Sequence, residues 1–485
     1  MAVQGDPTGL DVLSSLIDSG ISGITLGTAT HDSRLVTPGS LYACLRGAAF
    51  DGHDFAADAV SAGAAALLVD HPLGADVAGD TPQIVVDDTR LRLGPIAALL
   101  AGSPSRHLTT VGITGTNGKT TTAHLLAAIF ETNGWQTGVV GTLHGPRTTP
   151  EAPELQAMLS DFVKSGSTAA VLEVSSHALQ LHRVDGTEFD AVVFTNLGHD
   201  HLDLHGTPEQ YFRAKASLFV ADFAPIGVIN IDDPYGRLLA DTAVSDAQDG
   251  DFRVVGYSSS DISDVEVMAD HHKYRWRGAM IEVAIGGGFN VSNSLAALTT
   301  AVELGIDIDV AAEGLRSVEQ VPGRFEVVRT VASENGGFTV VVDYAHTPDG
   351  LAEVLDSARR VCDAGATVTI VFGCGGDRDR EKRPEMGAVA SRLADRVIIT
   401  SDNPRNEDPE AIIDDVMHGV DDAYRGCVMT NPDRRSAIAE AISGAERGDV
   451  VVIAGKGHEQ TQDLGTSIVD FDDRVVARAA MEDVA

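Results

Sequence analysis

The sequence contains little cysteine and no long apolar run. Its 485 residues include 4 cysteines at scattered positions with no paired spacing, so neither a disulfide framework nor a zinc site is expected. Reduced cysteines of this kind are typical of a cytoplasmic protein. No apolar run approaches the roughly 20 residues that a membrane-spanning helix needs. The polar residues that follow Met1 predict no signal peptide.

Positive charge is also scarce. The chain carries 35 basic against 71 acidic residues, a formal net charge of −36. Such a charge disfavours binding to nucleic acid and to anionic membranes, so we expect neither as a partner. We expect the acidic residues to form a solvated surface, and a pocket for an anionic ligand would have to be locally basic.

Lysine is confined to a few positions. It occurs only at residues 119, 164, 215, 273, 382 and 456, and four of these (Lys119, Lys215, Lys382 and Lys456) fall within the motifs described below. Lysines distributed at random over a surface would not cluster in this way, which indicates that some of them serve a site.

Short β-branched runs alternate with Ala/Leu-rich helical stretches along the chain. The predicted strands are residues 64–69, 109–114, 169–174, 191–196, 227–231, 339–344, 367–372, 396–400 and 450–455. Strands that alternate with helices are typical of parallel α/β sheets covered by helices on both faces. With 43% hydrophobic residues, a chain of this length suits about three globular domains.

Two polar, proline-containing breaks divide the chain. The segment "AGSPSRH" (101–107) precedes a new strand, and "EQVPGRFEVV" (319–328) follows a long helical stretch. These breaks predict domains at residues 1–107, 108–322 and 323–485.

The segment "VGITGTNGKTTTAHLLAAIF" reads as strand, glycine loop and helix. Its glycines allow backbone N–H groups to surround a phosphate at the helix N-terminus. Lys119 can neutralise the β- and γ-phosphates, and the Thr120 hydroxyl can ligate Mg²⁺. The spacing departs from the usual P-loop because Ile113 stands five residues before Gly118. The loop predicts ATP binding; the alternative is an ordinary glycine turn.

Several further motifs resemble one enzyme family when they are taken together and in order. They are "GTNGKTT", "LEVSSHAL", "TNLGHDHLDLHG", "RAKASLF", "VPGRFE", "DYAHTPDGL", "GCGGDRDREKRP", "DNPR" and "GKGHE". This set resembles the Mur ligase family over essentially the whole chain. The resemblance implies an α/β protein of three domains: a UDP-substrate-binding domain, a central P-loop ATPase-like parallel sheet, and a Rossmann-like domain at the C-terminal end that binds the amino acid.

The resemblance also implies a reaction of peptidoglycan precursor synthesis, in which ATP and Mg²⁺ activate the γ-carboxylate of D-glutamate in UDP-MurNAc-L-Ala-D-Glu as an acyl phosphate. The amine of meso-diaminopimelate then displaces phosphate, with L-lysine as the alternative amine. We expect a cytoplasmic monomer. The competing hypotheses are another amide-forming relative, such as a folylpolyglutamate synthetase or a cyanophycin-type ligase, and a non-catalytic scaffold.

For the nucleotide, the resemblance implies contacts from Gly115, Thr116, Asn117, Gly118, Lys119, Thr120, Thr121, Arg324 and Asp343. The implied catalytic residues are Lys119, Glu173, His201 and Lys215, and the implied metal ligands are Thr120, Glu173, His201 and Lys215. Lys215 would be carbamylated by CO₂, which turns a cation into an oxygen ligand suited to Mg²⁺. The alternatives are a helix-capping Glu173, a turn histidine at 201 and a solvent-exposed Lys215.

For the UDP-sugar dipeptide, the resemblance implies contacts from His31, Ser33, Ala48, Ala49, Phe50, Thr148, Thr149, Ser175 and Arg183. An arginine is reasonable here because the substrate is anionic. Each polar residue taken alone could equally be a turn or a cap. The segment 143–147 is shorter than in many relatives, and Leu181 and His199 depart from common family residues, which leaves the fine contacts open.

For the added amino acid, the resemblance implies contacts from Arg378, Asp402, Asn403, Pro404, Arg405, Gly455 and Glu459. Diaminopimelate differs from lysine by a distal carboxylate, which the planar guanidinium of Arg405 can bind through two parallel hydrogen bonds. Asp402 and Glu459 offer anions for the distal ammonium. Lysine would leave Arg405 unpaired, a loss of roughly 1.5–3 kcal/mol. The alternative is that Arg405 caps a helix or pairs with Glu407 or Asp408.

Overall fold

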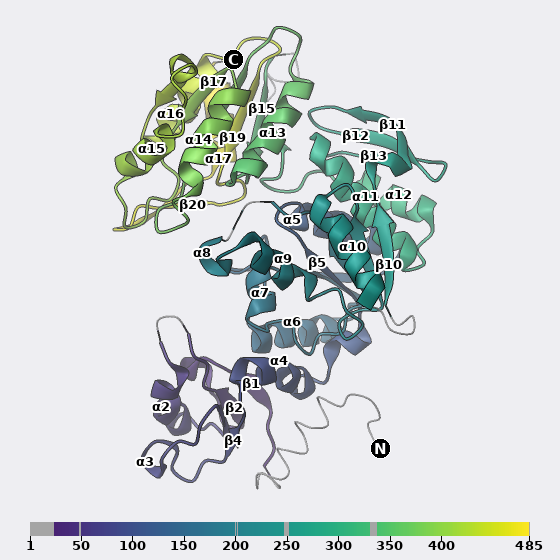
Figure 1. The fold of residues 1–485 in the computed structure, drawn as a ribbon, viewed down its shortest axis with the longest axis vertical. Coiled ribbons are helices and arrows are strands. Elements are labelled where there is room, and N and C mark those ends of the chain that lie inside the picture. The colour runs from purple at the N-terminus through teal and green to yellow at the C-terminus, as the bar shows by residue number, and fades with distance from the viewer. Residues whose placement is uncertain are drawn as a thin grey trace.

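The computed structural model describes residues 24–47, 50–198, 200, 202–246, 252–329 and 337–484. Figure 1 shows three α/β bodies in succession along the longest axis of the molecule, which confirms the predicted three-domain α/β fold. The predicted boundaries near residues 107 and 322 stay predictions. Within the described part of the chain, no helix is both long and apolar enough to cross a membrane.

The N-terminal domain has a four-stranded parallel sheet in the order β1-β2-β3-β4. Its strands are β1 (Thr28–Thr30), β2 (Ser40–Ala43), β3 (Ala66–Val69) and β4 (Gln83–Val85), and its helices are α2 (Ala56–Ser61), α3 (Ala75–Ala78) and α4 (Thr89–Leu100). Of these strands only β3 was predicted, because the others are too short to give a pattern. Helix α4 packs on the central domain, where a Cβ on Gly94 would lie 2.3 Å from the Asp185 carbonyl oxygen.

The central domain is built on a six-stranded parallel sheet in the order β10-β9-β8-β5-β7-β6. Its strands are β5 (Thr109–Thr114), β6 (Thr137–Val140), β7 (Ala169–Glu173), β8 (Ala191–Phe194), β9 (Ile226–Asn230) and β10 (Arg253–Tyr257). Its helices are α5 (Lys119–Thr132), α6 (Ala152–Lys164), α7 (Ser176–Gln180), α8 (Leu202–His205), α9 (Pro208–Ala216), α10 (Pro234–Asp246), α11 (Gly288–Glu303) and α12 (Ile308–Ser317). The predicted apolar runs form its inner strands, which are buried on both faces as expected for a parallel sheet.

A small antiparallel sheet in the central domain was not predicted. It consists of β11 (Ile262–Val267), β12 (His272–Trp276) and β13 (Ala279–Val283). One face of these strands is exposed and polar, so they lack the continuous apolar runs that marked the parallel strands. The other face packs its buried side chains against the central core.

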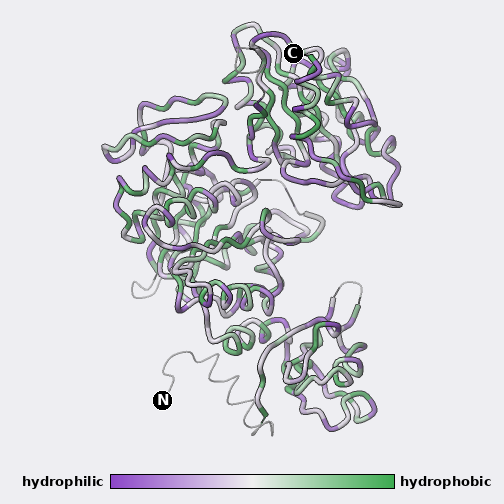
Figure 2. Tube along the Cα trace, turned by 180° about the vertical axis from the view of Figure 1, so that it is seen from behind, coloured by the Kyte–Doolittle hydropathy of each residue, from purple (hydrophilic) through white to green (hydrophobic). Residues whose placement is uncertain are grey.

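The C-terminal domain has a six-stranded sheet in the order β14-β15-β19-β16-β17-β18, parallel except for β14. Its strands are β14 (Glu326–Val327), β15 (Thr339–Asp343), β16 (Val368–Phe372), β17 (Arg396–Ile399), β18 (Val428–Thr430) and β19 (Val450–Ala454), with a separate hairpin of β20 (Thr461–Asp463) and β21 (Ile468–Asp470). Its helices are α13 (Pro348–Val361), α14 (Lys382–Leu393), α15 (Pro409–Met417), α16 (Arg434–Ser443) and α17 (Asp473–Asp483). Hydrophobic segments run through the inside of this domain in Figure 2.

The carboxyl ends of parallel strands meet at one edge of a sheet, and open α/β sheets bind ligands there. In the central sheet, β5 leads into the glycine loop at this edge and β7 ends at Glu173. In the C-terminal sheet, β15 ends at Asp343, β19 precedes Gly455, and β17 is followed by Asp402. The topology therefore gathers motifs that lie far apart in the sequence.

Candidate functional site

A cleft of about 560 Å³ lies between the central and C-terminal domains. It is lined by Thr116, Asn117, Gly118, Lys119, Thr120, Thr121, Thr142, Thr148, Glu173, Asn196, Asp200, Asn230, Asp232, Asp233, Pro234, Phe289, Ser292, Asn293, Arg324, Asp343, Tyr344, Ala345, His346, Gly350 and Glu353. Except for Gly115, all the residues predicted to contact the nucleotide are among them. The cleft therefore combines the carboxyl edge of the central sheet with residues of the C-terminal domain.

The glycine loop turns sharply into α5. Gly118 has φ +86°, in the left-handed region, and a Cβ there would lie 2.2 Å from Asn293 Oδ1. The Lys119 ammonium donates to the carbonyl oxygens of Gly115 and Thr116, each at 2.9 Å. Burial lowers the pKa of Lys119. The lysine is thus held at the mouth of a loop shaped to receive an anion.

Glu173 is almost fully buried at the end of β7, where it faces this loop. Its Oε2 accepts hydrogen bonds from the hydroxyls of Thr120 at 2.9 Å and Thr142 at 3.2 Å, and its Oε1 accepts the Thr142 N–H at 2.9 Å. The carboxylate does not cap a helix, because Ser175 caps α7. The buried pairing of Glu173 with Thr120 brings two of the predicted metal ligands together.

Arg324 reaches from the domain junction to the glycine loop. Its Nη2 donates to Thr120 Oγ1 at 3.2 Å, and its guanidinium lies 4.5 Å from the centre of the Tyr344 ring. The Asp343 carboxylate accepts the backbone N–H groups of Phe325 and Ala345, each at 2.7 Å. Burial raises the pKa of Asp343. Asp343 therefore fixes the turn that carries Arg324 into the cleft.

Lys215 is 1% exposed, so the alternative of a solvent-exposed helix lysine is wrong. Its ammonium donates to the Gly115 carbonyl oxygen at 2.8 Å and lies 4.6 Å from the centre of the Tyr211 ring. Burial and the nearby charge of Lys119 hold the pKa of Lys215 well below its usual range. Only the neutral amine reacts with CO₂, and a lowered pKa favours that form.

The predicted ligand His201 and the neighbouring His199 lie outside the described residues. Asp200, between them, is described and lines the cleft. Its carboxylate lies near Lys119 and Lys215. It is therefore a further buried oxygen donor in the cleft, beside those of Glu173 and Thr120.

The residues predicted to contact the UDP-sugar dipeptide occupy two regions. Ser33 begins a short 3-10 helix in the N-terminal domain, and Phe50 is highly exposed there, whereas Ala48 and Ala49 lie outside the described residues. The Nδ1 of His31 is buried without a hydrogen-bond partner among the described residues.

The other members of this set surround Glu173. Thr149 Oγ1 donates to the Glu173 carbonyl oxygen at 2.8 Å, and Thr148 Oγ1 lies 3.0 Å from Thr142 Oγ1. Arg183 is paired with Glu151 at 2.8 Å. Ser175 is the N-cap of α7, so its hydroxyl has the structural role that is the alternative to substrate binding.

The short segment 143–147 forms a cavity of its own. This cavity of about 300 Å³ is lined by Val140, Gly141, His144, Gly145, Pro146, Arg147, Pro150, Glu154 and Met158. Glu154 also approaches His31 and Arg147, at 4.0 Å each. The cavity therefore links the N-terminal and central parts of the predicted substrate site.

Arg405 lies at the carboxyl edge of the C-terminal sheet. Its φ of +52° is in the left-handed region, which is uncommon for a residue with a side chain. Its Nη1 donates to the Gly376 carbonyl oxygen at 2.6 Å, and it forms no ion pair with any described carboxylate. Glu407 pairs with Arg380 and Arg383, and Asp408 caps α15, so neither alternative partner is used.

The remaining residues of this set form a polar cluster. Asn403 Nδ2 donates to Glu459 Oε2 at 2.9 Å, and Lys456, which is fully buried, donates to the same oxygen at 2.9 Å. A Cβ on Gly455 would lie 2.8 Å from Asp402 Oδ2. Pro404 is buried, whereas Arg378 is exposed. Apart from Arg378, the predicted amino-acid-binding residues thus converge on two strand ends.

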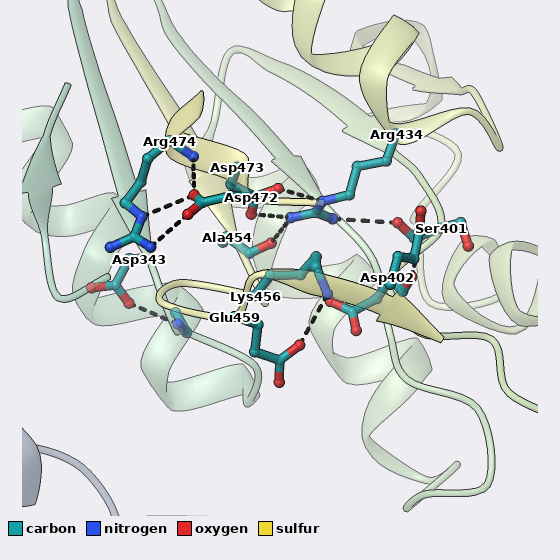
Figure 3. A network of polar contacts seen from close by, with 12 residues as sticks. Asp343, Ser401, Asp402, Arg434, Ala454, Lys456, Glu459, Asp472, Asp473 and Arg474 are labelled. Carbon is teal, nitrogen blue, oxygen red and sulfur yellow. Dashed lines mark hydrogen bonds and ion pairs between the residues drawn. The ribbon is translucent and has the colours of Figure 1, made fainter. Parts of the chain in front are cut away.

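A buried arginine beside this cluster, shown in Figure 3, was not predicted. Arg434 donates to both carboxylate oxygens of Asp473, at 2.8 and 2.7 Å, and to the carbonyl oxygens of Ala454 at 2.9 Å and Ser401 at 3.4 Å. These two carbonyls lie at the ends of β19 and just after β17. Arg434 therefore connects the two strand ends that carry the polar cluster.

Three family models match the chain in succession. They are the Mur ligase family catalytic domain over residues 27–100, the Mur ligase middle domain over 113–301 and the Mur ligase glutamate ligase domain over 323–457. A protein of Streptomyces coelicolor named UDP-N-acetylmuramoyl-L-alanyl-D-glutamate–2,6-diaminopimelate ligase is 44% identical over 479 residues, which cover 93% of this chain and 92% of the relative. The chain belongs to the Mur ligase family.

Other relatives carry the same name. One from Geobacillus kaustophilus is 43% identical and covers 93% of this Mur ligase and 94% of its own length. A solved structure of a protein so named is 35% identical, with a TM-score of 0.66 over 94% of this chain and 95% of that one. The MurF ligase of Thermotoga maritima in complex with ADP, 20% identical with a TM-score of 0.62 over 95% of this chain and 97% of that one, shares the fold.

Some cleft residues of this Mur ligase were not predicted. Asn196 accepts the Asn117 N–H through Oδ1 at 2.9 Å, and Asn293 faces Gly118. Glu353 lies in the same cleft, where burial and nearby carboxylates raise its pKa to about 7. Asn196 could have been predicted from its position after the strand β8. Glu353 lies within a helix, and no sequence pattern marked it as a cleft residue.

Proposed function

We propose that this Mur ligase adds meso-diaminopimelate to the γ-carboxylate of D-glutamate in UDP-MurNAc-L-Ala-D-Glu, with hydrolysis of ATP. The names of the relatives with 43–44% identity support the reaction. The observation that carries the choice of amine is Arg405, a half-buried arginine that forms no ion pair with a described carboxylate and lies beside the Asp402–Glu459 cluster.

The distal end of diaminopimelate carries one carboxylate and one ammonium. Arg405 would bind the carboxylate through its planar guanidinium. Asp402 would face the ammonium together with Glu459, whose Oε1 accepts no hydrogen bond from a described residue. Lys456 neutralises part of the charge on Glu459 and fixes its position. Lysine lacks the distal carboxylate and would leave Arg405 desolvated without an anion.

In the first step, an oxygen of the D-glutamyl γ-carboxylate attacks the γ-phosphorus of ATP, and ADP leaves. Both reactants are anions, so positive groups must screen them as charge shifts. We assign this role to Lys119, to Arg324 and to the N-terminus of α5, whose free N–H groups face the loop. Arg324 reaches Thr120 from the junction with the C-terminal domain, at 3.2 Å.

The donors around this loop suit Mg²⁺. Thr120 and Glu173 present oxygen ligands, which this hard cation prefers, in a buried setting. A carbamylated Lys215 and His201 would supply the remaining predicted ligands, close to Asp200. When bound, the ion would supply positive charge that neutralises the charge developing on the phosphoryl group during transfer.

In the second step, the amine nitrogen attacks the carbonyl carbon of the acyl phosphate. A C–N bond forms, the C–O bond to phosphate breaks, and the nitrogen loses a proton. Closure of the C-terminal domain over the cleft would bring the amine to the acyl phosphate and exclude water, which would otherwise hydrolyse it.

Further parts of the proposal concern the rest of the chain. We propose that His31, Ser33 and residues 48–50 contact the UDP group, and that Thr148, Thr149, Ser175 and Arg183 contact the sugar dipeptide. We propose a cytoplasmic location, because ATP and UDP-linked precursors are cytoplasmic compounds, and the monomeric state stays a prediction.

The direct test is phosphate release with UDP-MurNAc-L-Ala-D-Glu, ATP, Mg²⁺ and one of two amines. We expect release with meso-diaminopimelate and at least about tenfold lower kcat/KM with L-lysine, from the loss of a charged hydrogen bond. Equal rates with both amines would refute the proposed role of Arg405. Release with neither amine would refute the ligase assignment itself.

A further inference from the structure

A cluster of metal-ligating side chains lies in the N-terminal domain, away from the ATP cleft. It consists of His53 on the 3-10 helix Gly52–Phe55, and of Asp70 and His71, which follow β3. One potential ligand atom from each residue lies within 4.8 Å of the others. Among the described residues it is the only such group of three or more His, Cys, Asp or Glu side chains. The cysteines gave no reason to expect such a site.

The imidazole of His53 is held with one nitrogen aimed at this cluster. The residue is 8% exposed, and its Nδ1 lies 2.6 Å from Asp51 Oδ1. If Nδ1 carries the proton for that bond, Nε2 presents a lone pair. Nε2 has no hydrogen-bond partner among the described residues, although Asp70 Oδ1 is 3.2 Å away. Two lone pairs that face one another repel, so a cation bound between them, either a proton or a metal ion, would stabilise this arrangement.

The spacing of these atoms suits a metal ion. Two ligands at about 2.0 Å from a tetrahedral ion are roughly 3.3 Å apart, and the separation of His53 Nε2 from Asp70 Oδ1 is 3.2 Å. His71 Nδ1 lies 2.5 Å from the same oxygen and would have to move outward by about 0.8 Å to reach that spacing. Its side chain is 51% exposed and can make that adjustment.

The surroundings resemble the outer shell of known metal sites. Asp51 on His53 Nδ1 forms the carboxylate–histidine arrangement that fixes the tautomer of a metal-bound imidazole. Arg46 donates to Asp70 Oδ2 at 2.7 Å and more weakly to Oδ1 at 3.3 Å, which favours the ionised carboxylate, and Oδ1 also faces both histidines. Asp51 and Asp70 carry two negative charges and Arg46 carries one positive charge. The net negative charge favours a divalent cation.

We propose that His53, Asp70 and His71 bind a first-row divalent transition metal of the Zn²⁺ class, with water as the fourth ligand. Two imidazoles and one carboxylate suit such an ion better than Mg²⁺ or Ca²⁺, which prefer oxygen ligands. Asp51 positions His53 and does not contact the metal. The site would tie His53, two residues after the Arg46–Asp51 bridge, to the two residues that follow β3.

The chain offers a matched control. Asp270 and His271 form another adjacent pair, with His271 Nδ1 2.8 Å from Asp270 Oδ1 and Arg329 donating to Asp270 Oδ2 at 2.7 Å. His271 is 47% exposed, close to the value for His71. The next residue, His272, is fully buried, but its two ring nitrogens already have partners in the Ile285 carbonyl oxygen and Ser294 Oγ, so the pair reproduces the exposed half of the proposed site alone.

The experiment is a Zn²⁺ titration of the metal-free full-length chain by calorimetry, without ATP. We compare the wild type with His71→Ala, His271→Ala and Asp51→Asn. We expect one tight site in the wild type and in His271→Ala, and affinity at least tenfold lower in His71→Ala. Asp51→Asn should lose about 10–100-fold, as for other outer-shell partners. Nitrogen NMR of labelled histidine should show Zn²⁺ on Nε2 of His53.

Any other result would argue against the proposed metal site. A wild type without a tight site would overturn the proposal, and so would unchanged affinity in His71→Ala. Equal losses in His71→Ala and His271→Ala would mean general surface binding and would also overturn it. Because both histidines are exposed, matching melting temperatures of the metal-free variants will exclude misfolding as the cause.

Discussion

Arg434 and Asp473 form an ion pair in which neither side chain is exposed to solvent (Figure 3). The pair joins the first residues of α16 and α17, which are 39 positions apart in the sequence. Through the carbonyls of Ala454 and Ser401, Arg434 also holds the ends of the strands that lead to Gly455 and Asp402. The polar cluster of the amino-acid site thus rests on a buried charge pair.

Arg434→Ala should strongly destabilise the protein. Removing one partner leaves Asp473 as an uncompensated buried charge, which destabilises a fold by about 3–5 kcal/mol. Denaturation by urea, followed by fluorescence, measures the change. Arg435→Ala, at the exposed neighbour, is the control and should change the free energy of unfolding by less than about 1 kcal/mol. Similar small losses for both variants would mean that the pair contributes little.

The sequence predicted the parallel strands and the glycine loop because their signals are local. A run such as "TVVVDY" is apolar and β-branched, and the strand β15 forms where it was expected. The resemblance to the Mur ligases singled out Lys215, but its burial against Gly115 depends on contacts 100 positions apart. Pattern alone would have made it an exposed helix lysine.

The sequence could not predict which charged residues are buried, nor could it predict the strands whose residues are largely exposed. Arg434 looks like a surface residue from its sequence neighbours, since its burial depends on Asp473, 39 positions away. The antiparallel strand β11 escaped notice for the opposite reason, because its residues are largely exposed and polar. In both cases the deciding information lies in contacts between distant segments.

Gly118→Ala should abolish tight ATP binding. A Cβ at this position would lie 2.2 Å from Asn293 Oδ1, and the residue has φ +86°. Gly134→Ala is the matched control, since Gly134 has φ +82° but no atom within 4 Å of the added Cβ. Both substitutions should destabilise the fold by roughly 1–2 kcal/mol through backbone strain. Only Gly118→Ala should weaken Mg-ATP binding, measured by calorimetry; equal weakening would contradict the assignment of the loop.

Lys215→Ala should lose both a carbamate and the activity. The lowered pKa of Lys215 leaves more neutral amine near pH 7 to react with CO₂. With ¹³C-bicarbonate, NMR should show a carbamate signal that is absent from Lys215→Ala, and phosphate release should fall at least about 100-fold. We do not expect high bicarbonate to restore the activity. Lys164→Ala, at an exposed lysine paired with Asp161, should keep the signal and the rate. A full rate in Lys215→Ala would reject its catalytic role.

Arg405→Ala should weaken the use of diaminopimelate without a comparable effect on ATP. Loss of a charged hydrogen bond predicts a rise of about 10–100-fold in KM for diaminopimelate. Arg405→Lys keeps the charge but lacks the planar fork, so it should rescue only part of the loss. The control is Arg380→Ala, since Arg380 is exposed and pairs with Glu407. Equal rises in the KM values for ATP and diaminopimelate would remove the argument.

Glu353 should make stability depend on pH. Burial, together with the carboxylates of Asp349, Asp343 and Asp233, raises its pKa from 4.5 to about 7. Between these values the folded chain holds a proton that the unfolded chain has released, so stability falls as pH rises. The stabilising effect is complete below about pH 4.5 and is lost as pH rises through about 7. A shift of this size corresponds to at most about 3 kcal/mol.

Glu353→Gln should remove this dependence, because an amide does not titrate and resembles the protonated acid. Urea denaturation at intervals from pH 4.5 to 8 should show the variant gaining stability over the wild type as pH rises, with the difference levelling off above about pH 7. Glu385→Gln, at an exposed site on α14, should run parallel to the wild type. The stability difference between the wild type and Glu353→Gln could instead stay constant across this pH window. That result would show that Glu353 is ionised throughout, and the cleft would then carry one more negative charge near the phosphates than we infer.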